Sequence, residues 1–552
     1  MATTVEPERA PKAVALATDD APLTTVAAGE DRPVAPMRST LSRLLNNSLR
    51  YALPCATGLV AIGVVLRFVA PTELWLDEAL SVNIARLPLP QILGALRHDG
   101  APPLYYLLLH MWMLVFGEGN FAVRALSGVI SVACLPLAWT VGRRVGGHRL
   151  AWATLLLMAT SPFALTYAAS ARMYSLMILW TLLGFLAIAR AMEVPSTRRL
   201  TAVGMVTALI LYTHYWGIYL VAVTGLCLLL RAKRSRSDRS DLTEEQQRTA
   251  WSCFVAMALG SLAFLPWLPS FIFQLLHTGT PWSNAAGLGD ILSVLGQYAG
   301  GGPWGAALGL TLFTLVLLGV FGESHDGRHV LVNLKARRKA RPVAFVLMGT
   351  LMVAVLCGAL AQAAFVGRYT AVVFPLFMIL AGLGVVVFSD RRVLAVVMAW
   401  TTMAGLIVGV GANVSQRTEA GPVAKVINSQ ANTNDLVLYC PDQLGPAVSR
   451  LITARVVQAT FPRGDPPQKS NWVDYRQAVH LANVQQFAQQ MVSQAAGHDI
   501  YFVFNPSYPG TEHKCTRLMD WLSNLRSNGQ VLVQPNPGNY YEFESLVRFP
   551  EM

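Results

Sequence analysis

Apolar residues in this chain gather in long, almost uninterrupted runs. Runs of about 20 apolar residues, the length of helix that crosses ~30 Å of hydrocarbon, recur between residues 51 and 413. The predicted membrane-spanning helices are 51–70, 123–142, 150–169, 173–192, 200–214, 215–231, 250–271, 303–321, 343–363, 370–388 and 393–413. A further run, 103–117, is short for a full crossing, which favours a re-entrant or interfacial helix. The pattern predicts a mainly α protein, a polytopic transmembrane bundle of about 11–13 spans.

Basic residues gather at particular turns between these helices. They lie at 143–144, 198–199, 231–239, 335–341 and 391–392. Because Lys and Arg are enriched in short cytoplasmic loops, these turns are expected on the inner side of the membrane. Alternation then places outside the membrane 72–102, 165–174, 213–216, 272–302, 364–369 and everything from 414. This count holds if 103–117 does not cross completely.

Composition supports the membrane assignment and excludes several classes of protein. Only 13% of the 552 residues are charged and 53% are hydrophobic, whereas about 25% are charged in an ordinary soluble domain. A soluble enzyme, a disordered chain and a coiled coil are therefore excluded. The net charge is 43 − 31 = +12. Cytoplasmic loops explain this charge, so no nucleic-acid partner is predicted.

The last part of the chain has a different pattern. From residue 414, polar sequence with short β-rich runs at 435–440, 454–460, 499–505 and 530–536 alternates with helical patterns such as 473–495 and 512–527. The predicted organisation is a disordered cytoplasmic tail (1–45), a transmembrane domain (46–413) and an extracytoplasmic α/β domain (414–552). Outside the cytoplasm, Cys440 and Cys515 could form a disulfide. Aromatic residues of this domain could stack on sugar rings, although such residues more often belong to a core: Trp472, Tyr508, Tyr540 and Tyr541.

Acidic residues follow the first predicted span. In the sequence LWLDEA, Asp77 and Glu78 are adjacent at the membrane surface, where a carboxylate can act as a general base. Their alternative role is to begin a helix, since acids favour the first turn. His98 and Asp99 follow in HDGAPPLYY, where the alternative is a capped helix start beside interfacial aromatics. Asp77, Glu78 and Asp99 could also hold a divalent cation such as Mg²⁺ or Mn²⁺, but the sequence does not require one.

Two arginines depart from the clustering of basic residues in the expected cytoplasmic turns. Arg172 in SARMYSL and Arg368 in VGRYT lie in loops expected on the outer side, and His214 lies in a third such loop, LYTHYW. An arginine at a helix end can extend to lipid headgroups, which is the structural alternative. A guanidinium also offers a planar fork for phosphate oxygens, so the pair indicates a site for a phosphorylated ligand.

The ordered set of motifs resembles one superfamily of membrane enzymes. LWLDEA, HDGAPPLYY, FAVRALSG with Arg124, SARMYSL, LYTHYW and VGRYTAVVFP occur in this order within 51–413. They resemble the C-type (GT-C) glycosyltransferases, specifically the glycosyltransferase family 39 group related to protein O-mannosyltransferases and the lipid A aminoarabinose transferase. The resemblance implies a GT-C fold, a polyprenyl-phosphate-sugar donor and Asp77 as catalytic base.

With that donor in place, each polar residue of the motifs has an expected role. Asp77 and Glu78 are the catalytic candidates. The donor phosphate is expected at Arg172, Arg368 and Tyr369. The residues expected to position the substrates or the base are His98, Asp99, Arg124, Tyr174 and His214.

The predicted activity is transfer of a sugar, mannose or another hexose or pentose, to a hydroxyl on the outer face of the cell membrane, with inversion. The acceptor would be a cell-envelope glycan, a glycolipid or a protein. The alternative from another class is a transporter or flippase for a lipid-linked glycan. A transporter is expected to have paired broken helices near the middle of the membrane, whereas the polar motifs here lie at the outer ends of the spans.

Overall fold

The computed structural model describes residues 52–233, 243–279, 286–325, 329–361, 365–526 and 529–551. Residues from Ala52 onward form one compact unit. The tail predicted for 1–45 and part of the basic loop at 231–239 lie outside the described residues.

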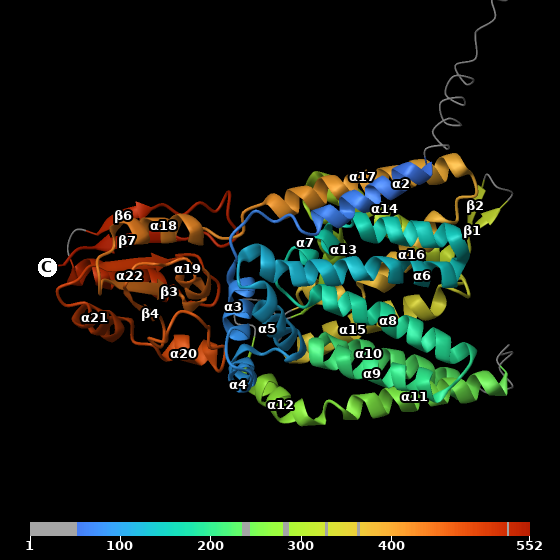
Figure 1. Cartoon of the computed structure of the whole chain (residues 1–552), viewed down its shortest axis with the longest axis horizontal. Helices are drawn as coiled ribbons and strands as arrows, with labels where there is room; N and C mark the ends of the chain where they lie inside the picture. Colours follow the sequence, from blue (N-terminus) through green and yellow to red (C-terminus); the bar gives the residue numbers. More distant parts are fainter. Residues whose placement is uncertain are drawn as a thin grey trace, which may run out of the picture. The chain divides into compact units, whose positions relative to one another are not determined.

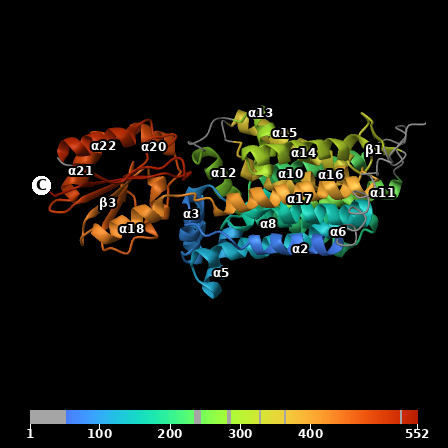
Figure 2. The same ribbon diagram turned by 90° about the horizontal axis from the view of Figure 1, so that it is seen from above.

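Helices occupy every predicted span (Figures 1 and 2). The helices before the C-terminal sheet are α2 (Ala52–Leu66), α3 (Leu76–Ala85), α4 (Leu89–Asp99), α5 (Leu104–Phe116), α6 (Asn120–Thr160), α7 (Pro162–Ala168), α8 (Tyr174–Glu193), α9 (Thr197–Thr213), α10 (Trp216–Ala232), α11 (Glu244–Leu262), η1 (Leu265–Trp267), α12 (Leu268–His277), α13 (Gly289–Ala299), α14 (Gly302–Phe321), α15 (Arg341–Leu360), η2 (Gly367–Val372), α16 (Phe374–Val385) and α17 (Arg391–Val414). Within the described residues, six helical stretches are long and apolar enough to cross a membrane. The chain is therefore a multi-pass membrane protein.

Helix α6 contains two of the predicted spans. Its backbone leaves the helical conformation at Gly146 and Gly147, and Gly147 has a φ of +80°, which favours glycine. A Cβ on Gly142 would lie 2.9 Å from the Cα of Ala151. These positions would be about 13 Å apart along a continuous helix, so the chain turns back on itself here. The turn follows Arg143 and Arg144, where the sequence predicts a cytoplasmic loop.

Short helices lie beside the spans at the end nearer the C-terminal sheet (Figure 1). Helix α5 has 13 residues. Its length is about 20 Å, too short for ~30 Å of hydrocarbon, which agrees with an interfacial helix. It packs against α3 through a buried face that includes Tyr105 and Tyr106, while Leu114 and Val115 are exposed. Helices α3, α4 and α5 form the platform on which the polar motifs lie.

The C-terminal region is a five-stranded mixed sheet with helices. Its strands have the order β4 (Val457–Thr460), β3 (Leu436–Cys440), β5 (Ile500–Phe504), β7 (Ser545–Phe549) and β6 (Gln530–Val533). The first three are parallel, and β7 and β6 are antiparallel to their neighbours. Its helices are α18 (Ala420–Gln430), η3 (Asp442–Leu444), α19 (Gly445–Ser449), α20 (Tyr475–Leu481), α21 (Val484–Gln494) and α22 (Lys514–Leu525).

Both faces of this sheet are covered, which explains its continuously apolar central strands. On one face, Leu438 and Phe502 pack with Phe487 of α21 and Leu518 of α22. On the other face, Val437 packs with apolar residues of α18. The predicted GT-C type of fold, a helical membrane bundle with a C-terminal α/β region, agrees with this architecture.

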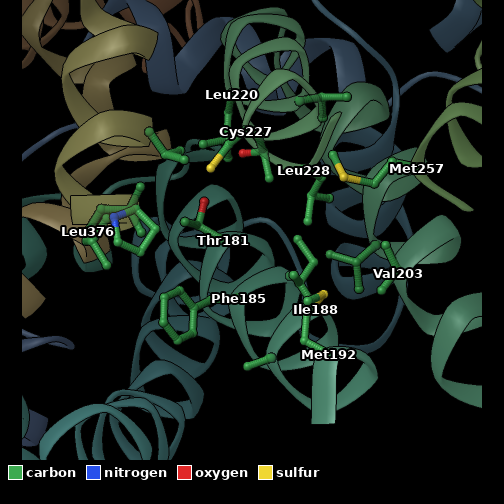
Figure 3. A pocket seen from close by; sticks show the side chains of 18 of the residues that line it. Thr181, Phe185, Ile188, Met192, Val203, Leu220, Cys227, Leu228, Met257 and Leu376 are labelled. Atoms are coloured by element: carbon green, nitrogen blue, oxygen red, sulfur yellow. The ribbon is translucent and has the colours of Figure 1, made fainter. Parts of the chain in front are cut away.

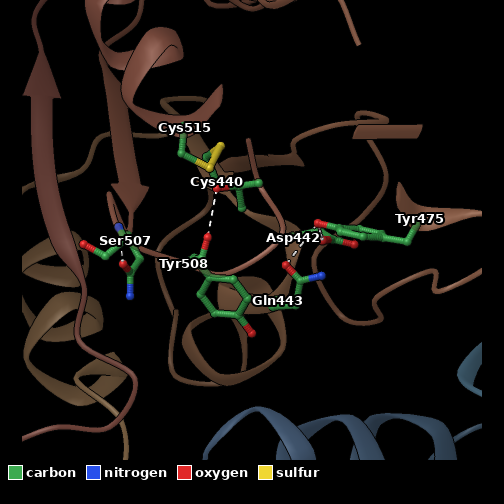
Figure 4. The surroundings of a disulfide bond; sticks show 9 residues. Cys440, Asp442, Gln443, Tyr475, Ser507, Tyr508 and Cys515 are labelled. Carbon is green, nitrogen blue, oxygen red and sulfur yellow. Dashed lines mark hydrogen bonds between the residues drawn. A yellow bond between two sulfur atoms is a disulfide. The ribbon is translucent and has the colours of Figure 1, made fainter. Parts of the chain in front are cut away.

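A disulfide joins Cys440, at the end of β3, to Cys515 in α22 (Figure 4). Their Cα atoms are 5.4 Å apart. The pairing that the sequence allows is therefore present. The other five cysteines are free thiols.

Some elements differ from the prediction. The helical pattern 473–495 is divided into α20 and α21, because the side chain of Asn483 accepts a hydrogen bond from the Gln486 amide and begins a new helix. Strand β7 was not predicted from its sequence. A two-stranded hairpin, β1 (Gly322–His325) and β2 (His329–Val332), was also not predicted.

Candidate active site

A cavity of about 540 Å³ lies between the platform helices and the C-terminal region. Its charged and polar lining residues come from segments far apart in the sequence: Asp77, Asp99, Arg172, His214, Thr278, Arg368, Asn505, Ser507 and Glu542. Its aromatic lining residues are Trp75, Tyr215, Trp216, Tyr219, Tyr369, Trp472, Tyr508, Tyr541 and Phe543. Charged groups and aromatic faces in one hollow fit a ligand that has a phosphate and a sugar ring.

Asp77 lies in the first turn of α3, facing this cavity. Its Oδ2 atom is 3.3 Å from an Nη atom of Arg368, and both side chains are largely buried. Arg368 lies in η2, whose close approach to α13 requires Gly367, since a Cβ there would collide with the side chain of Gln297. The aromatic rings of Trp75 and Tyr369 lie under the Arg368 guanidinium at 5.7 and 5.6 Å. Aromatic faces and a carboxylate thus fix this arginine in place.

Arg172 approaches the same end of α3 from the loop between α7 and α8. Its Nη1 atom donates to the carbonyl oxygen of Asp77 at 3.2 Å and to the hydroxyl of Ser81 at 3.0 Å. Two arginines from segments nearly 200 residues apart therefore contact Asp77, Arg368 at the carboxylate and Arg172 at the backbone carbonyl oxygen. This arrangement brings together the carboxylate and the two guanidinium groups that the sequence predicts.

The electrostatic state of Asp77 follows from these neighbours. Burial alone would raise the pKa of Asp77, but the charges of Arg368, Arg172 and Arg417 outweigh burial and hold it below its ordinary value. Burial, together with the same two cavity arginines, lowers the pKa of His214 to about 3. At neutral pH the cavity therefore contains an ionised Asp77 and a neutral His214.

Asp99 ends α4 and also lines the cavity. Gly100 follows it in the left-handed conformation, with a φ of +85°, and ends the helix. The hydroxyl of Tyr106 donates to Asp99 Oδ2 at 2.8 Å. Burial raises the pKa of Asp99, although the charge of Arg172 and the Tyr106 hydrogen bond oppose this change. This carboxyl can hold a substrate hydroxyl.

Glu78, the second catalytic candidate, does not line the cavity that Asp77 faces. Successive residues of an α-helix point about 100° apart, so the two carboxylates face different surroundings. Glu78 is buried and forms two hydrogen bonds with Arg124, at 2.9 and 2.7 Å. It also accepts the amide of Ala171 at 2.9 Å, next to Arg172. The pair of Glu78 and Arg124 therefore holds the loop of Arg172 against α3 and does not line the cavity.

Three other predicted residues lie outside the cavity lining. His98 is exposed, and its backbone oxygen accepts the amide of Trp472. Tyr174 is buried, with its ring 4.7 Å from that of Tyr167. Tyr540 does not line the cavity, whereas its neighbour Tyr541 does. Tyr174 supports the site from behind, since its ring lies 6.0 Å from the Arg172 guanidinium.

The C-terminal region supplies a residue that the sequence did not reveal. The Leu76 amide, at the start of α3, donates to Glu542 Oε2 at 3.0 Å. Helix α3 has no side-chain cap of its own, so Glu542 satisfies one of its free amides. Burial raises the pKa of Glu542 to about 8. No motif marks this residue, and only the fold brings it within reach of a helix 466 positions earlier.

The metal site that the sequence allowed, with Asp77, Glu78 and Asp99 as ligands, does not assemble because Glu78 points toward Arg124. In the described part of the chain, no group of three or more His, Cys, Asp or Glu side chains is placed to hold a metal ion.

Comparisons with known proteins show which family and fold this chain resembles. The family model described as dolichyl-phosphate-mannose-protein mannosyltransferase matches residues 100–268. A search of curated proteins finds no match. The crystal structure of ArnT from Cupriavidus metallidurans bound to undecaprenyl phosphate is 13% identical, with a TM-score of 0.53 over 91% of this chain and 98% of that chain. The same protein in its apo state is 14% identical, with a TM-score of 0.53 over 90% and 98%.

A more distant similarity is to the crystal structure of the Archaeoglobus fulgidus oligosaccharyltransferase in complex with Zn and sulfate. It is 10% identical, with a TM-score of 0.45 over 81% of this chain and 68% of that chain.

The fold shared with ArnT along nearly its whole length is that of a C-type glycosyltransferase, so the predicted fold class is confirmed. The family-model match covers residues 100–268, and together with the shared fold it indicates a membrane glycosyltransferase similar to the protein mannosyltransferase and ArnT-like groups.

Proposed function

We propose that this glycosyltransferase moves a sugar from a polyprenyl-phosphate donor to a hydroxyl acceptor on the extracytoplasmic face, with inversion at the anomeric carbon. The observation that supports this proposal most is the position of Asp77 between Arg172 and Arg368 in one cavity. The match to a family described by a dolichyl-phosphate-mannose donor, and the undecaprenyl phosphate bound to ArnT, favour a lipid-phosphate donor.

In this proposal the two arginines bind the donor phosphate. Each guanidinium presents paired N–H donors that fit phosphate oxygens, and both are held in place before the donor arrives. At 3.3 Å and an effective dielectric of about 20, a unit charge pair is worth ~5 kcal/mol. The donor phosphate therefore competes with Asp77 for Arg368.

Competition between the donor phosphate and Asp77 for Arg368 makes the Asp77 carboxylate a stronger base. Without donor, the arginines make the Asp77 carboxylate a weak base, because they hold its pKa down. When the phosphate neutralises them, the pKa of Asp77 rises toward that of a buried carboxyl, and the group becomes a better proton acceptor. Binding of the donor thus prepares the base for the acceptor.

The transfer itself is one displacement. The acceptor oxygen attacks the anomeric carbon while its proton passes to Asp77. The bond between that carbon and the phosphate oxygen breaks, and polyprenyl phosphate leaves with its charge stabilised by Arg172 and Arg368. Attack opposite the leaving group inverts the anomeric carbon. Asp99 and His214 line the space beside these groups, where they can hold sugar hydroxyls.

The C-terminal region completes the cavity on the acceptor side. Trp472, Tyr508 and Tyr541 are among its lining residues, as is the amide of Asn505. Aromatic faces and an amide suit a sugar or peptide acceptor. Mannose, or another hexose or pentose, is the proposed donor sugar, and a cell-envelope glycan, a glycolipid or a protein is the proposed acceptor.

Purified protein incubated with a panel of polyprenyl-phosphate sugars and membrane extract as acceptor source tests this function. We expect polyprenyl phosphate to be released with one sugar and the sugar to appear on an acceptor. A lipid-glycan flippase would leave the sugar–phosphate bond intact in every case. Repeating the reaction with EDTA and with added Mg²⁺ or Mn²⁺ determines whether a divalent ion contributes.

A further inference from the structure

A second cavity of about 340 Å³ lies inside the helix bundle. Its walls are formed mainly by α8, α9, α10 and α15, and they are almost entirely apolar. Figure 3 shows Phe185, Ile188, Leu228 and Met257 around the open space, with the hydroxyl of Thr181 at one side. A partly open and almost entirely apolar hollow of this size can take up an apolar chain.

This cavity and the active-site cavity lie at different heights along the helices α10 and α15. Trp216 and Tyr219, in the first turn of α10, line the active-site cavity. The α10 residues that line the second cavity come later in the helix, from Leu220 to Arg231. Leu220 and Arg231 are eleven residues apart, which corresponds to about 16 Å along the helix axis. On α15, Ala354 and Gly358 line the active site, and Val343 and Val346, nearer its start, line the second cavity. The second cavity therefore extends toward the helix ends remote from Asp77.

Two cations lie at that remote end. Arg231 is in the last turn of α10, and Lys339 lies two residues before the start of α15. The Nε atom of Arg231 is buried and has no hydrogen-bond partner among the described residues. Lys339 is exposed. An apolar cavity with two positive charges at one end is complementary to a lipid with an anionic headgroup.

We propose that this cavity holds an acyl chain of an anionic phospholipid from the leaflet opposite the active site, with its phosphate bound by Arg231 and Lys339. The polyprenyl tail of the donor is a different occupant, because its phosphate would lie near Arg172 and Arg368 and its tail would gain nothing from cations at the far end. The site is independent of the transfer reaction.

Native mass spectrometry of the delipidated protein, titrated with phosphatidylglycerol or phosphatidylcholine of the same acyl chains, tests the proposal. We expect preferential retention of phosphatidylglycerol by the wild type. The variant R231A/K339A should bind it about 25-fold more weakly, from about fivefold for each basic residue near an anionic lipid. The control R198A/R391A removes two exposed charges outside this cavity and should bind like the wild type.

A second variant tests the apolar part of the site. Cys227 lines the cavity, and Cys227→Phe would fill part of it while both cations remain. We expect this variant to lose the lipid and to remain monodisperse in size-exclusion chromatography. Equal binding of both lipids by the wild type, unchanged binding by R231A/K339A, or displacement of phosphatidylglycerol by equimolar polyprenyl phosphate would each overturn the proposal.

Discussion

Replacing Asp77 with Asn removes one negative charge from the active-site cavity and keeps the size of the side chain. In the proposed reaction this change removes the proton acceptor. General bases contribute about 10²- to 10⁴-fold to rate, so the Asp77→Asn variant should lose at least about 100-fold in kcat. This loss corresponds to about 2.7 kcal/mol in the activation barrier.

Donor binding should respond in the opposite direction. Asp77 lies 3.3 Å from Arg368 and competes with the donor phosphate for that arginine. Without the carboxylate, both arginines are available, so the variant should bind donor as tightly as the wild type or more tightly. Single-turnover release of polyprenyl phosphate measures the chemical step, and titration of the detergent-solubilised protein with polyprenyl phosphate measures affinity.

The adjacent residue provides the control. Glu78→Gln makes the same chemical change one position later, but it breaks the buried pair with Arg124. Breaking a buried ion pair costs about 3–5 kcal/mol, so this variant should show a lower melting temperature and a lower yield of folded protein. The reasoning is refuted if Asp77→Asn turns over within threefold of the wild-type rate, or if it loses donor affinity in parallel with rate.

Three further outcomes are expected. Arg172→Ala and Arg368→Ala should each weaken binding of polyprenyl phosphate about 10- to 100-fold, as for the loss of hydrogen bonds to a charged group, and wild-type affinity in both would contradict the phosphate assignment. As pH is lowered, kcat should begin to fall at a higher pH than kcat/KM, because bound donor neutralises the arginines and so raises the pKa of Asp77. If both profiles fell at the same pH, donor binding would not change the pKa of Asp77. Because burial raises the pKa of Glu542 from 4.5 to about 8, the folded state keeps its proton while the unfolded state releases it, so wild-type stability falls between about pH 5 and pH 8. Glu542→Gln should flatten that fall in melting temperature, and an unchanged slope would exclude Glu542 as its source.

Much of the site could be predicted from the sequence because charges are rare in a membrane protein. Arg172 and Arg368 are conspicuous since they lie away from the basic turns, and Asp77 since it follows an apolar span. The structure places all three together. These predictions did not depend on knowing how the helices pack.

The sequence could not predict contacts that depend on the direction of a side chain or on the approach of distant segments. Glu78 has the same chemistry and sequence context as Asp77. One position later in the helix its side chain points in another direction, where it forms a buried pair with Arg124. Glu542 lies in a region without a recognised motif, and its contact with Leu76 spans almost the whole chain. The break between α20 and α21 depended on a local hydrogen bond of Asn483 that a general helical pattern does not predict.

The central claim is that one cavity holds a lipid phosphate between Arg172 and Arg368, next to Asp77. The most direct test is a cryo-EM structure of the protein with polyprenyl phosphate bound. The account predicts phosphate density within hydrogen-bonding distance of both guanidinium groups, with the Asp77 carboxylate in the same cavity on the side from which the acceptor attacks. Phosphate density elsewhere in the protein, with this cavity containing only solvent, would contradict it.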